Sequence, residues 1–254
     1  MILDTFKLDG KVAVVTGGSR GLGQSAALAL AEAGADIALL DYSPATETIE
    51  KIAALGRRTY STQIDLIAAS PDQIEAAIAG VVDAMGRVDI LVNNAGIIRR
   101  TPVAEHSAKD WDDVIAINQN AVFHLCQSAG RHMIAQGSGK IINIASMLSF
   151  QGGITVPGYA ASKHAVAGIT KALANEWASK GVNINAIAPG YMATDNTAQL
   201  RADVEREKAI VDRIPAARWG TPADLAGPFV FLASPASDYL NGAIIPVDGG
   251  WLVR

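Results

Sequence analysis

The residues most suited to acid-base chemistry are a tyrosine and a lysine four positions apart, Tyr159 and Lys163, in the stretch YAASK. The surrounding residues have the pattern of an amphipathic helix, and residues four apart lie on one helical face. The phenol and the ammonium would therefore point the same way and could act on one small molecule. Chance alone places such a pair in roughly one chain in five or six of this composition. A surface tyrosine beside a solvated lysine stem is thus the alternative.

Composition limits the classes of function. With 254 residues, half of them apolar, the chain is long enough for one large α/β domain or two small ones. The 21 basic and 25 acidic residues nearly balance and form no basic stripe, which argues against nucleic acid and anionic membranes as partners. Cys126 is the only cysteine, so neither an intrachain disulfide nor a thiolate metal cluster can form.

The same features predict a metal-free protein of the reducing cytoplasm. The four histidines have no spacing to carboxylates that suits a metal site. The first residues, MILDTFKLDGK, lack a basic segment followed by a long apolar run, and no apolar stretch reaches the roughly 18 residues that a membrane span needs. We therefore expect a soluble protein that is not exported.

Short β-branched segments alternate with longer helical patterns along the whole chain. Most of these segments are apolar throughout, which indicates burial on both faces, as in a parallel sheet. The alternation predicts a single doubly wound, Rossmann-type α/β domain over residues 1–254, with helices on both faces of a mostly parallel seven-stranded sheet. The expected strands are 11–16, 36–41, 58–64, 89–94, 140–146, 182–188 and 243–249.

Several expected helices have clear start signals. Ser70 and Gln73 have the spacing of a capping box, with Pro71 in the first turn, and Thr221-Pro222 repeats the combination of cap and proline. Ser107 opens a long predicted helix in the same manner, and Gly137 is placed to end it.

Residues 189–222 form a longer and more charged insertion between the sixth expected strand and the last helix. The insertion follows the carboxyl end of a strand, where doubly wound sheets bind ligands. We therefore predict a flap that covers a substrate. A peripheral helical pair without a gating role is the alternative.

Three glycines, Gly17, Gly21 and Gly23, lie between the first expected strand and the first helix. Glycines at this point allow a tight turn and bring backbone N–H groups, with the positive end of the helix, close to a phosphate. Asp41 ends the second strand, where a carboxylate accepts hydrogen bonds from adenosine ribose hydroxyls and repels a 2′-phosphate. Arg20 could instead grip that phosphate. Because an anion facing a phosphate in a partly desolvated pocket costs more than a solvated arginine, we predict NAD(H).

Further motifs accompany these features in a set order: NNAG at 93–96, Asn118, Ser146, Tyr159-x-x-x-Lys163 and PG at 189–190. Together they resemble the classical short-chain dehydrogenase/reductase family over essentially the whole chain. Each part is weak evidence alone, whereas the ordered set is highly specific. The resemblance implies an oxidoreductase with a nicotinamide cofactor.

The resemblance also implies roles for four residues. Tyr159 would be the general acid and base, and lowering a phenol's pKa from about 10 to about 7 takes roughly 4 kcal/mol, which Lys163 and the cationic nicotinamide would supply. Lys163 would also hold the nicotinamide ribose, and Ser146 would bind the substrate oxygen. Asn118, midway along its helix, would hold a water that links Lys163 to solvent. The alternatives are a strand-end cap for Ser146 and a wet helix face for Asn118.

Further cofactor contacts follow from the same resemblance. Asp65 and Leu66, just after the third strand, would bind the adenine and its flank, although Asp65 could instead be a turn residue. In full, the expected cofactor-binding residues are Gly17, Ser19, Arg20, Gly21, Leu22, Gly23, Asp41, Asp65, Leu66, Asn93, Ala95, Gly96, Tyr159, Lys163, Pro189, Gly190, Met192 and Thr194.

Within the family, segments such as IIRR at 97–100 and VDGGWLVR at 247–254 are similar to bacterial dehydrogenases that act on deoxy keto-sugar acids. Such a substrate has a carboxylate that Arg99 and Arg100 could clasp, and Gln151 could meet a sugar hydroxyl. The predicted substrate contacts are therefore Arg100, Ser146, Gln151 and Tyr159. Two exposed loop arginines without such a role are the alternative.

Two other functions remain open at this point. One is the same chemistry on another carbonyl compound, such as a polyol, a steroid or an acyl-thioester. The other is a dinucleotide-binding sensor without turnover, against which the intact Tyr159, Lys163 and Ser146 argue. Family members usually form tetramers through their central helices and C-terminal strand, so we expect a homotetramer, with Trp251 and Leu252 as apolar contacts.

Overall fold

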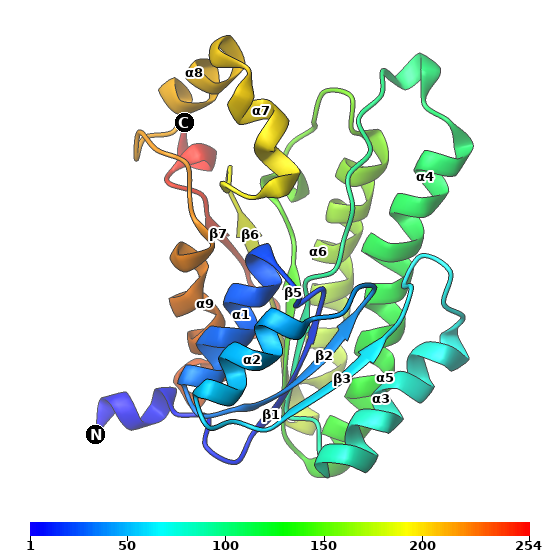
Figure 1. Cartoon of the computed structure of the whole chain (residues 1–254), viewed down its shortest axis with the longest axis vertical. Helices are drawn as coiled ribbons and strands as arrows, with labels where there is room; N and C mark the ends of the chain where they lie inside the picture. Colours follow the sequence, from blue (N-terminus) through cyan, green and yellow to red (C-terminus); the bar gives the residue numbers. More distant parts are fainter.

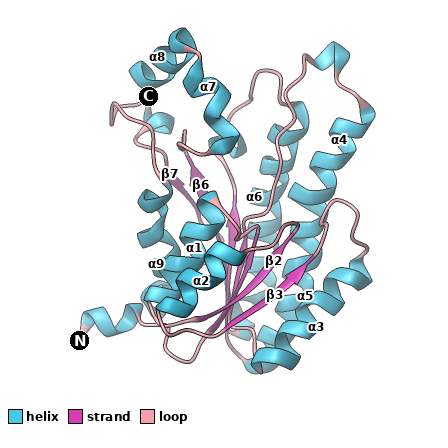
Figure 2. Ribbon diagram, viewed as in Figure 1, coloured by secondary structure: helices cyan, strands magenta, loops and turns pink.

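The computed structural model describes all residues, 1–254, and contains one sheet of seven parallel strands with helices on both faces (Figure 1, Figure 2). The strand order is β3-β2-β1-β4-β5-β6-β7. The order reverses between β1 and β4, which creates the crevice where doubly wound sheets bind ligands. The predicted fold and strands are confirmed, with bounds β1 (Val12–Thr16), β2 (Asp36–Asp41), β3 (Thr59–Gln63), β4 (Ile90–Asn93), β5 (Gly139–Ile144), β6 (Val182–Pro189) and β7 (Ile244–Val247).

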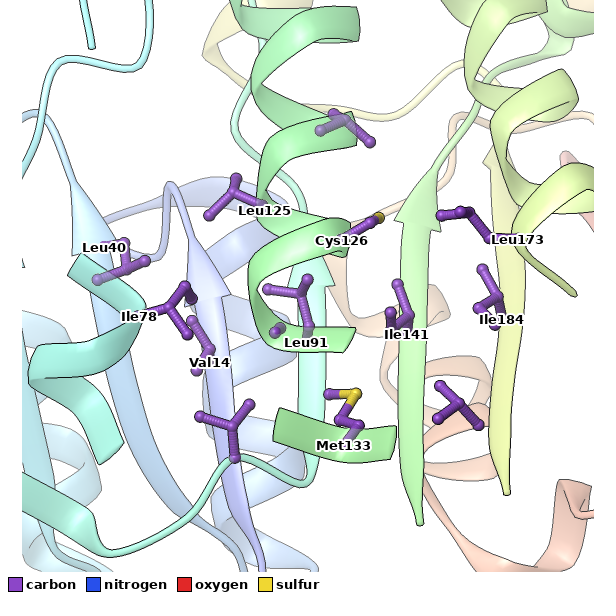
Figure 3. Packing of buried hydrophobic residues seen from close by; sticks show 14 of the residues in the cluster. Val14, Leu40, Ile78, Leu91, Leu125, Cys126, Met133, Ile141, Leu173 and Ile184 are labelled. Carbon is purple, nitrogen blue, oxygen red and sulfur yellow. The ribbon is translucent and has the colours of Figure 1, made fainter. Parts of the chain in front are cut away.

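Two apolar layers hold the helices against the sheet. One layer packs α3, α5 and α6 against one face and includes Ile78, Leu125 and Leu173 (Figure 3). The other packs α1, α2 and α9 against the opposite face and includes Leu30 and Phe229. The helices are α1 (Gly21–Glu32), α2 (Thr46–Ala54), α3 (Pro71–Met85), α4 (Ala108–Ile115), α5 (Ala121–Gln136), α6 (Pro157–Trp177), α7 (Ala198–Ala202), α8 (Val204–Arg213) and α9 (Ala226–Ala233). None is both long enough and apolar enough to cross a membrane.

The predicted helix starts and stops are found in the structure. Ser70 Oγ accepts a hydrogen bond from the Gln73 N–H at 3.3 Å, and Gln73 Oε1 accepts from the Ser70 N–H at 2.9 Å. Ser107 Oγ accepts from the Asp110 N–H at 3.1 Å, and Gly137 ends α5 with a left-handed φ of 71°. Pro222 begins a 3₁₀ turn, Pro222–Leu225, that leads into α9.

Two elements differ from expectation at functionally interesting residues. The long helix after Ser107 is interrupted by a π-helical turn, Ala116–Asn120, that contains Asn118, and such turns often occur at functional sites. β5 ends at Ile144, before Ser146, because Ser146 caps a 3₁₀ turn by accepting a hydrogen bond from the Leu148 N–H at 3.1 Å.

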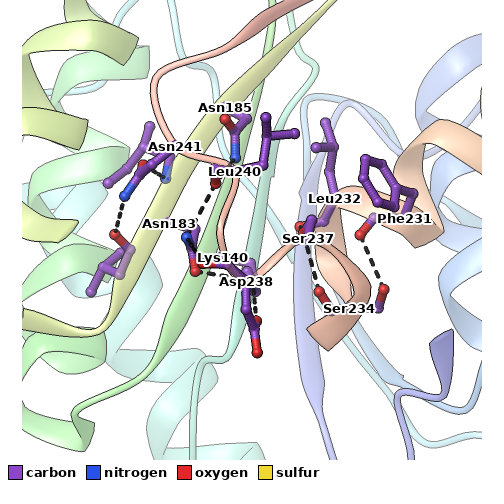
Figure 4. A network of polar contacts seen from close by, with 12 residues as sticks. Lys140, Asn183, Asn185, Phe231, Leu232, Ser234, Ser237, Asp238, Leu240 and Asn241 are labelled. Carbon is purple, nitrogen blue, oxygen red and sulfur yellow. Dashed lines mark hydrogen bonds and ion pairs between the residues drawn. The ribbon is translucent and has the colours of Figure 1, made fainter. Parts of the chain in front are cut away.

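A polar network holds the C-terminal segment against the sheet (Figure 4). Asn183 and Asn185 on β6 both donate to the Leu240 carbonyl, at 3.1 and 2.9 Å. Asn241 Oδ1 accepts from the Ile184 N–H at 2.8 Å. These bonds fix the chain just before β7, and the residues after β7 are thereby directed to the carboxyl edge of the sheet.

At Gly23, α1 lies so close to the turn after β1 that no side chain fits. A Cβ at this position would lie 2.0 Å from the Gly17 carbonyl oxygen. We expect Gly23→Ala to lower the free energy of unfolding by about 1–3 kcal/mol, because backbone rather than a flexible side chain must move. Gly168→Ala is the control, since nothing lies within 4 Å of that position on α6. It should stabilise by about 0.5–1 kcal/mol. Urea unfolding curves that rank the two variants in the opposite order would contradict this packing.

Candidate active site

A cleft of about 1100 Å³ opens at the carboxyl ends of the strands. Its walls are the loops after β1 to β6 together with the first turns of α1 and α6. Parallel pairing brings these loops, distant in sequence, to one edge of the sheet. The predicted site residues that line the cleft are Gly17, Ser19, Arg20, Gly21, Leu22, Asp41, Asp65, Leu66, Ala95, Gly96, Arg100, Ser146, Gln151, Tyr159, Lys163, Gly190 and Thr194.

The glycine-rich turn is held open by side chains from β1 and from the loop after β4. Thr16 Oγ1 accepts hydrogen bonds from the backbone N–H groups of Asn94 and Ala95, each at 3.0 Å. Asn94 Nδ2 donates to the carbonyls of Thr16 and Gly17, each at 3.0 Å. Gly17 and Gly21 have φ values of 64° and 58°, which other residues adopt only with strain. The first N–H groups of α1 therefore face the cleft without helical partners, as a phosphate site requires.

Asp41 and Arg20, the two residues that bear on cofactor choice, are held differently. Asp41 is 8% exposed, and its carboxylate accepts from the Ser19 N–H at 2.8 Å and the Ser43 N–H at 3.1 Å. Arg20 is exposed and extends to Asp195, with Nη1 3.4 Å from Oδ2. The carboxylate is thus fixed in the cleft wall, whereas the guanidinium points across the opening.

Asp65 is both a turn residue and a residue of the cleft wall. Its Oδ1 accepts from the Ile67 N–H at 2.9 Å, as in a turn, and the residue also lines the cleft. With the glycine turn and Asp41, it borders the part of the cleft that follows β1, β2 and β3. Free helix N–H groups, a fixed carboxylate and an elongated cleft together fit an adenine dinucleotide.

Tyr159, Lys163 and Ser146 meet in the other half of the cleft. Tyr159 and Lys163 lie on the first two turns of α6, and the Lys163 ammonium is 5.5 Å from the centre of the tyrosine ring. Lys163 Nζ donates to the Ile144 carbonyl at 2.5 Å, which ties α6 to the end of β5. Ser146, two residues after that carbonyl, lines the cleft together with Tyr159.

Burial shifts the pKa values of both Tyr159 and Lys163. Burial raises the pKa of Tyr159 above its ordinary value, by more than the neighbouring Ser146 hydroxyl and the positive charge of Arg100 lower it. Burial also lowers the pKa of Lys163 to about 8. In the chain alone, burial thus outweighs the nearby positive charge. The expected lowering of the tyrosine pKa also depends on the cationic nicotinamide and stays a prediction for the cofactor-bound enzyme.

Asn118 is completely buried and fully engaged with protein groups. Its Oδ1 accepts from the Ile97 N–H and its Nδ2 donates to the Ile97 carbonyl, each at 2.9 Å. Nδ2 also donates to Ser162 Oγ at 3.2 Å. Neither side-chain donor is left for a water, and the amide instead fastens the loop after β4 to α6.

Five predicted residues do not line the cleft: Gly23, Asn93, Asn118, Pro189 and Met192. Asn93 points into the core, where Nδ2 donates to Asn143 Oδ1 at 2.8 Å, and its neighbour Asn94 borders the cleft instead. Met192 is buried in the apolar layer that also holds Phe229. Adjacent residues of a strand point to opposite faces, so the NNAG motif alone did not distinguish the two asparagines.

Arg99 and Arg100, expected to clasp a carboxylate together, point apart. Arg99 Nε lies 3.4 Å from Asp110 Oδ1 on α4, whereas Arg100 lines the cleft and donates to the Asn196 carbonyl at 3.4 Å. Arg206 and Arg213 on α8 also line the cleft, and the sequence analysis missed them. Their spacing of seven residues signals one helical face but not what that face covers.

Trp251 also has a different environment from the one expected. It is 5% exposed and packs with Met147, Ile210 and Ile214 of its own chain. Its ring is therefore not an apolar contact offered at the surface. It forms part of the cleft wall.

Comparison with known proteins agrees with this arrangement. The family model described as short chain dehydrogenase matches residues 11–205. The chain belongs to this family. It is therefore an oxidoreductase that binds a nucleotide cofactor, as the ordered motifs predicted.

Relatives of similar length act on sugar acids, according to their names. A 2-dehydro-3-deoxy-D-gluconate 5-dehydrogenase from Escherichia coli (strain K12) is 60% identical over 255 residues, covering 100% of both proteins. The structure of a putative 2-deoxy-D-gluconate 3-dehydrogenase from Agrobacterium tumefaciens, with bound NADP, is 52% identical with a TM-score of 0.92 and covers 98% of this chain and 99% of that chain. A gluconate 5-dehydrogenase from Burkholderia cenocepacia, in complex with NADP and tartrate, is 40% identical with a TM-score of 0.95 over 100% of both chains. The closer resemblance expected within the family is confirmed.

Lys163 should make stability depend on pH. Its pKa is about 8 in the folded chain against 10.5 for an unperturbed lysine, so the unfolded chain binds more protons between these pH values and stability rises with pH. The charged form costs the folded state about 3 kcal/mol below pH 8. We expect Lys163→Met to be more stable than the wild type at pH 7 and to lose most of the rise in unfolding free energy between pH 8 and 10.

Lys171→Met provides the control, since this lysine is on the same helix but exposed. Urea unfolding at intervals of half a pH unit would give both slopes. If Lys163→Met kept the wild-type slope, the ammonium would not be the group that is charged at a cost.

Proposed function

We propose that the protein is an NAD(H)-dependent dehydrogenase that interconverts the C5 alcohol and ketone of 2-dehydro-3-deoxy-D-gluconate. The observation that carries the proposal is the meeting of Ser146, Tyr159 and Lys163 in one cleft with the glycine-rich turn. The full-length relatives with this activity in their names support the choice of substrate.

Tyr159 transfers the proton. In the oxidation, its phenolate takes the proton of the C5 hydroxyl while the C5 hydride leaves, and in the reduction its hydroxyl returns the proton to the C5 oxygen. When bound, the nicotinamide accepts or supplies the hydride, and its positive oxidised ring favours the phenolate. Ser146 donates to the C5 oxygen, where negative charge develops. Lys163 holds the nicotinamide ribose and adds its charge when protonated.

In this proposal, Asn118 holds two walls of the active site together. Its side chain joins the Ile97 backbone to Ser162 on α6, and both elements border the reactive half of the cleft. Both Nδ2 donors are thereby used, so a water that relays protons between Lys163 and solvent receives no hydrogen bond from the Asn118 side chain.

The cofactor is NAD(H) rather than NADP(H) in this proposal, although the Agrobacterium and Burkholderia relatives were solved with NADP. Asp41 is largely buried, and two N–H groups stabilise its charge. A 2′-phosphate would face this fixed anion. Arg20, the one cation of the glycine turn, is directed to Asp195.

The proposed substrate contacts are Ser146 and Tyr159 at the reacting carbon, with Gln151 and Arg100 farther along the cleft. Residues 189–222 form the proposed flap within a single catalytic domain, 1–254. Arg20 and Arg100 contact Asp195 and the Asn196 carbonyl at the start of this segment. These contacts cross the opening of the cleft, which supports a covering role.

We also propose a homotetramer in the cytoplasm. Trp111 on α4 and Phe123 on α5 are about two-fifths exposed, at 41% and 39%. Two large apolar side chains on neighbouring helices favour contact with another copy of the chain.

Tyr159→Phe tests the proposed chemistry. We expect kcat/KM for oxidation or reduction at C5 to fall by about 10²–10⁴-fold, because the proton has no carrier, with little change in the Kd for NAD. Absorbance of the reduced nicotinamide gives the rate. Tyr239→Phe is the control, since this tyrosine is fully exposed. A substrate panel that includes a polyol, a steroid and an acyl-thioester shows whether another carbonyl compound is preferred, which would refute the substrate assignment.

Asp41→Asn tests the cofactor preference. The change removes the charge and keeps the shape, so we expect the ratio of kcat/KM for NAD to that for NADP to fall by about tenfold or more. If the Arg20 guanidinium binds a 2′-phosphate, Arg20→Gln should lower activity with NADP. If NAD is the cofactor, Arg20→Gln should change the activity little. A wild-type enzyme that prefers NADP, together with an unchanged ratio in Asp41→Asn, would contradict the assignment.

A further inference from the structure

Three of the four arginines that line the cleft have no acidic partner. The chain as a whole has a net charge of −4, yet Arg100, Arg206 and Arg213 line the cleft and form no ion pair with a carboxylate. The acidic residues that line the cleft are Asp41, Asp65 and Asp195. The first two follow β2 and β3, and Asp195 is paired with Arg20. The positive charge of the three arginines is therefore uncompensated by the protein.

One face of α8 provides two of these arginines. Arg206, Ala209, Ile210 and Arg213 all line the cleft, and their spacing of three and four residues places them on one side of the helix. Lys208, on another side, instead pairs with Asp212. The basic face of α8 is thus directed at the cleft, whereas its lysine is paired on another side of the helix.

An apolar contact fixes this face close to the reacting groups. Ile210 is 3% exposed and packs in a cluster with Met147, Ile214 and Trp251. Met147 directly follows Ser146, so the cluster joins α8 to the turn that carries the serine hydroxyl. The arginines on either side of Ile210 are therefore held at a defined place relative to the reactive end of the cleft.

The C-terminal segment holds Arg213 in particular. The Arg213 guanidinium lies 3.9 Å from the centre of the Trp251 ring. Tyr191 packs edge-on against the same ring, with centroids 4.7 Å apart, and Arg254 donates to the Asp212 carbonyl at 3.1 Å. A guanidinium held against an aromatic face keeps its in-plane N–H groups free for a bidentate contact with a carboxylate.

We propose that Arg206 and Arg213 of α8, together with Arg100, bind the carboxylate of the substrate, and that Trp251 is the positioning residue for Arg213. The inference rests on the proposed function in one respect, the sugar-acid substrate. C1 and C5 are far apart along the six-carbon chain, so the carboxylate must bind away from Ser146 and Tyr159. α8 lines the cleft with residues other than those two and is anchored to the same serine turn.

Kinetics with a charged and a neutral substrate test the subsite. Arg213→Gln and Arg206→Gln should each raise KM for 2-dehydro-3-deoxy-D-gluconate by about 10–100-fold, the usual loss for a hydrogen bond to a charged group. KM for its methyl ester and kcat should change by less than about twofold. Lys208→Gln, which removes a paired cation from the same helix, should change neither KM. Equal effects on the acid and the ester, or no effect on the acid, would overturn the proposal.

Variants of the supporting residues separate positioning from folding. Trp251→Leu removes the aromatic face, so it should raise KM for the acid selectively, and Trp251→Phe should restore most of the wild-type value. Arg213→Lys keeps the charge but loses the planar group and should remain impaired. Selective impairment in Trp251→Leu with unchanged thermal unfolding supports the positioning role. A loss that is equal for acid and ester assigns Trp251 to the stability of the cleft wall and overturns that role.

A binding measurement separates failure of the subsite from failure of the proposed function. D-Gluconate and the uncharged D-glucitol can be titrated calorimetrically into the NAD-loaded wild type and into NAD-loaded Arg213→Gln. Preferential binding of D-gluconate that disappears in the variant supports the subsite even if the wild type fails to turn over the proposed substrate. Equal affinity of the two proteins for D-gluconate overturns the subsite even if turnover is found.

Discussion

The buried hydrogen bond from Lys163 to the Ile144 carbonyl is the contact on which the catalytic half of the cleft depends. It joins the second turn of α6 to the end of β5, the strand that leads into Ser146. With this bond in place, the tyrosine one turn earlier and the serine two residues later lie together in the cleft. Burial of an ammonium is costly, as the lowered pKa of this lysine shows. The fold thus accepts an unfavourable charge to position a reactive group, which is typical of functional sites.

The parallel sheet also positions the groups that bind the cofactor. Thr16 and Asn94 link the ends of β1 and β4 at the point where strand order reverses. The link leaves room for glycines with left-handed backbone and for the free N–H groups of α1. Asp41, held by two backbone N–H groups, then defines the far wall. Each of these contacts uses residues that are close in space only because all the strands run in the same direction.

The sequence predicted the fold well because buried parallel strands are nearly uniform in apolar character, and seven such segments stand out in this chain. It also predicted most of the cleft, since residues at strand ends must meet at one edge. It did not distinguish Asn93 from Asn94, because only the strand's rotation decides which side chain faces the core. It did not indicate the opposing effect of burial on the Tyr159 pKa, because burial is a property of the packed molecule. It missed Arg206 and Arg213, because the pattern of an exposed helix does not reveal what the helix covers.

The placement of Arg206 and Arg213 follows from what each half of the cleft binds, the cofactor in one and the substrate in the other. The cofactor half is built from strand ends and a helix start, where backbone geometry supplies the N–H groups that a phosphate needs. A sugar acid has its carboxylate several carbons from the reacting centre, so a rigid strand end that positions Ser146 cannot also reach the carboxylate. A separate segment must do this, and α8 is attached to the serine turn through an apolar cluster that includes Ile210 and Met147. A substitution on the open face of α8 would therefore alter which anion is bound while leaving Ser146, Tyr159 and Lys163 in register, so substrate choice can change without change of chemistry.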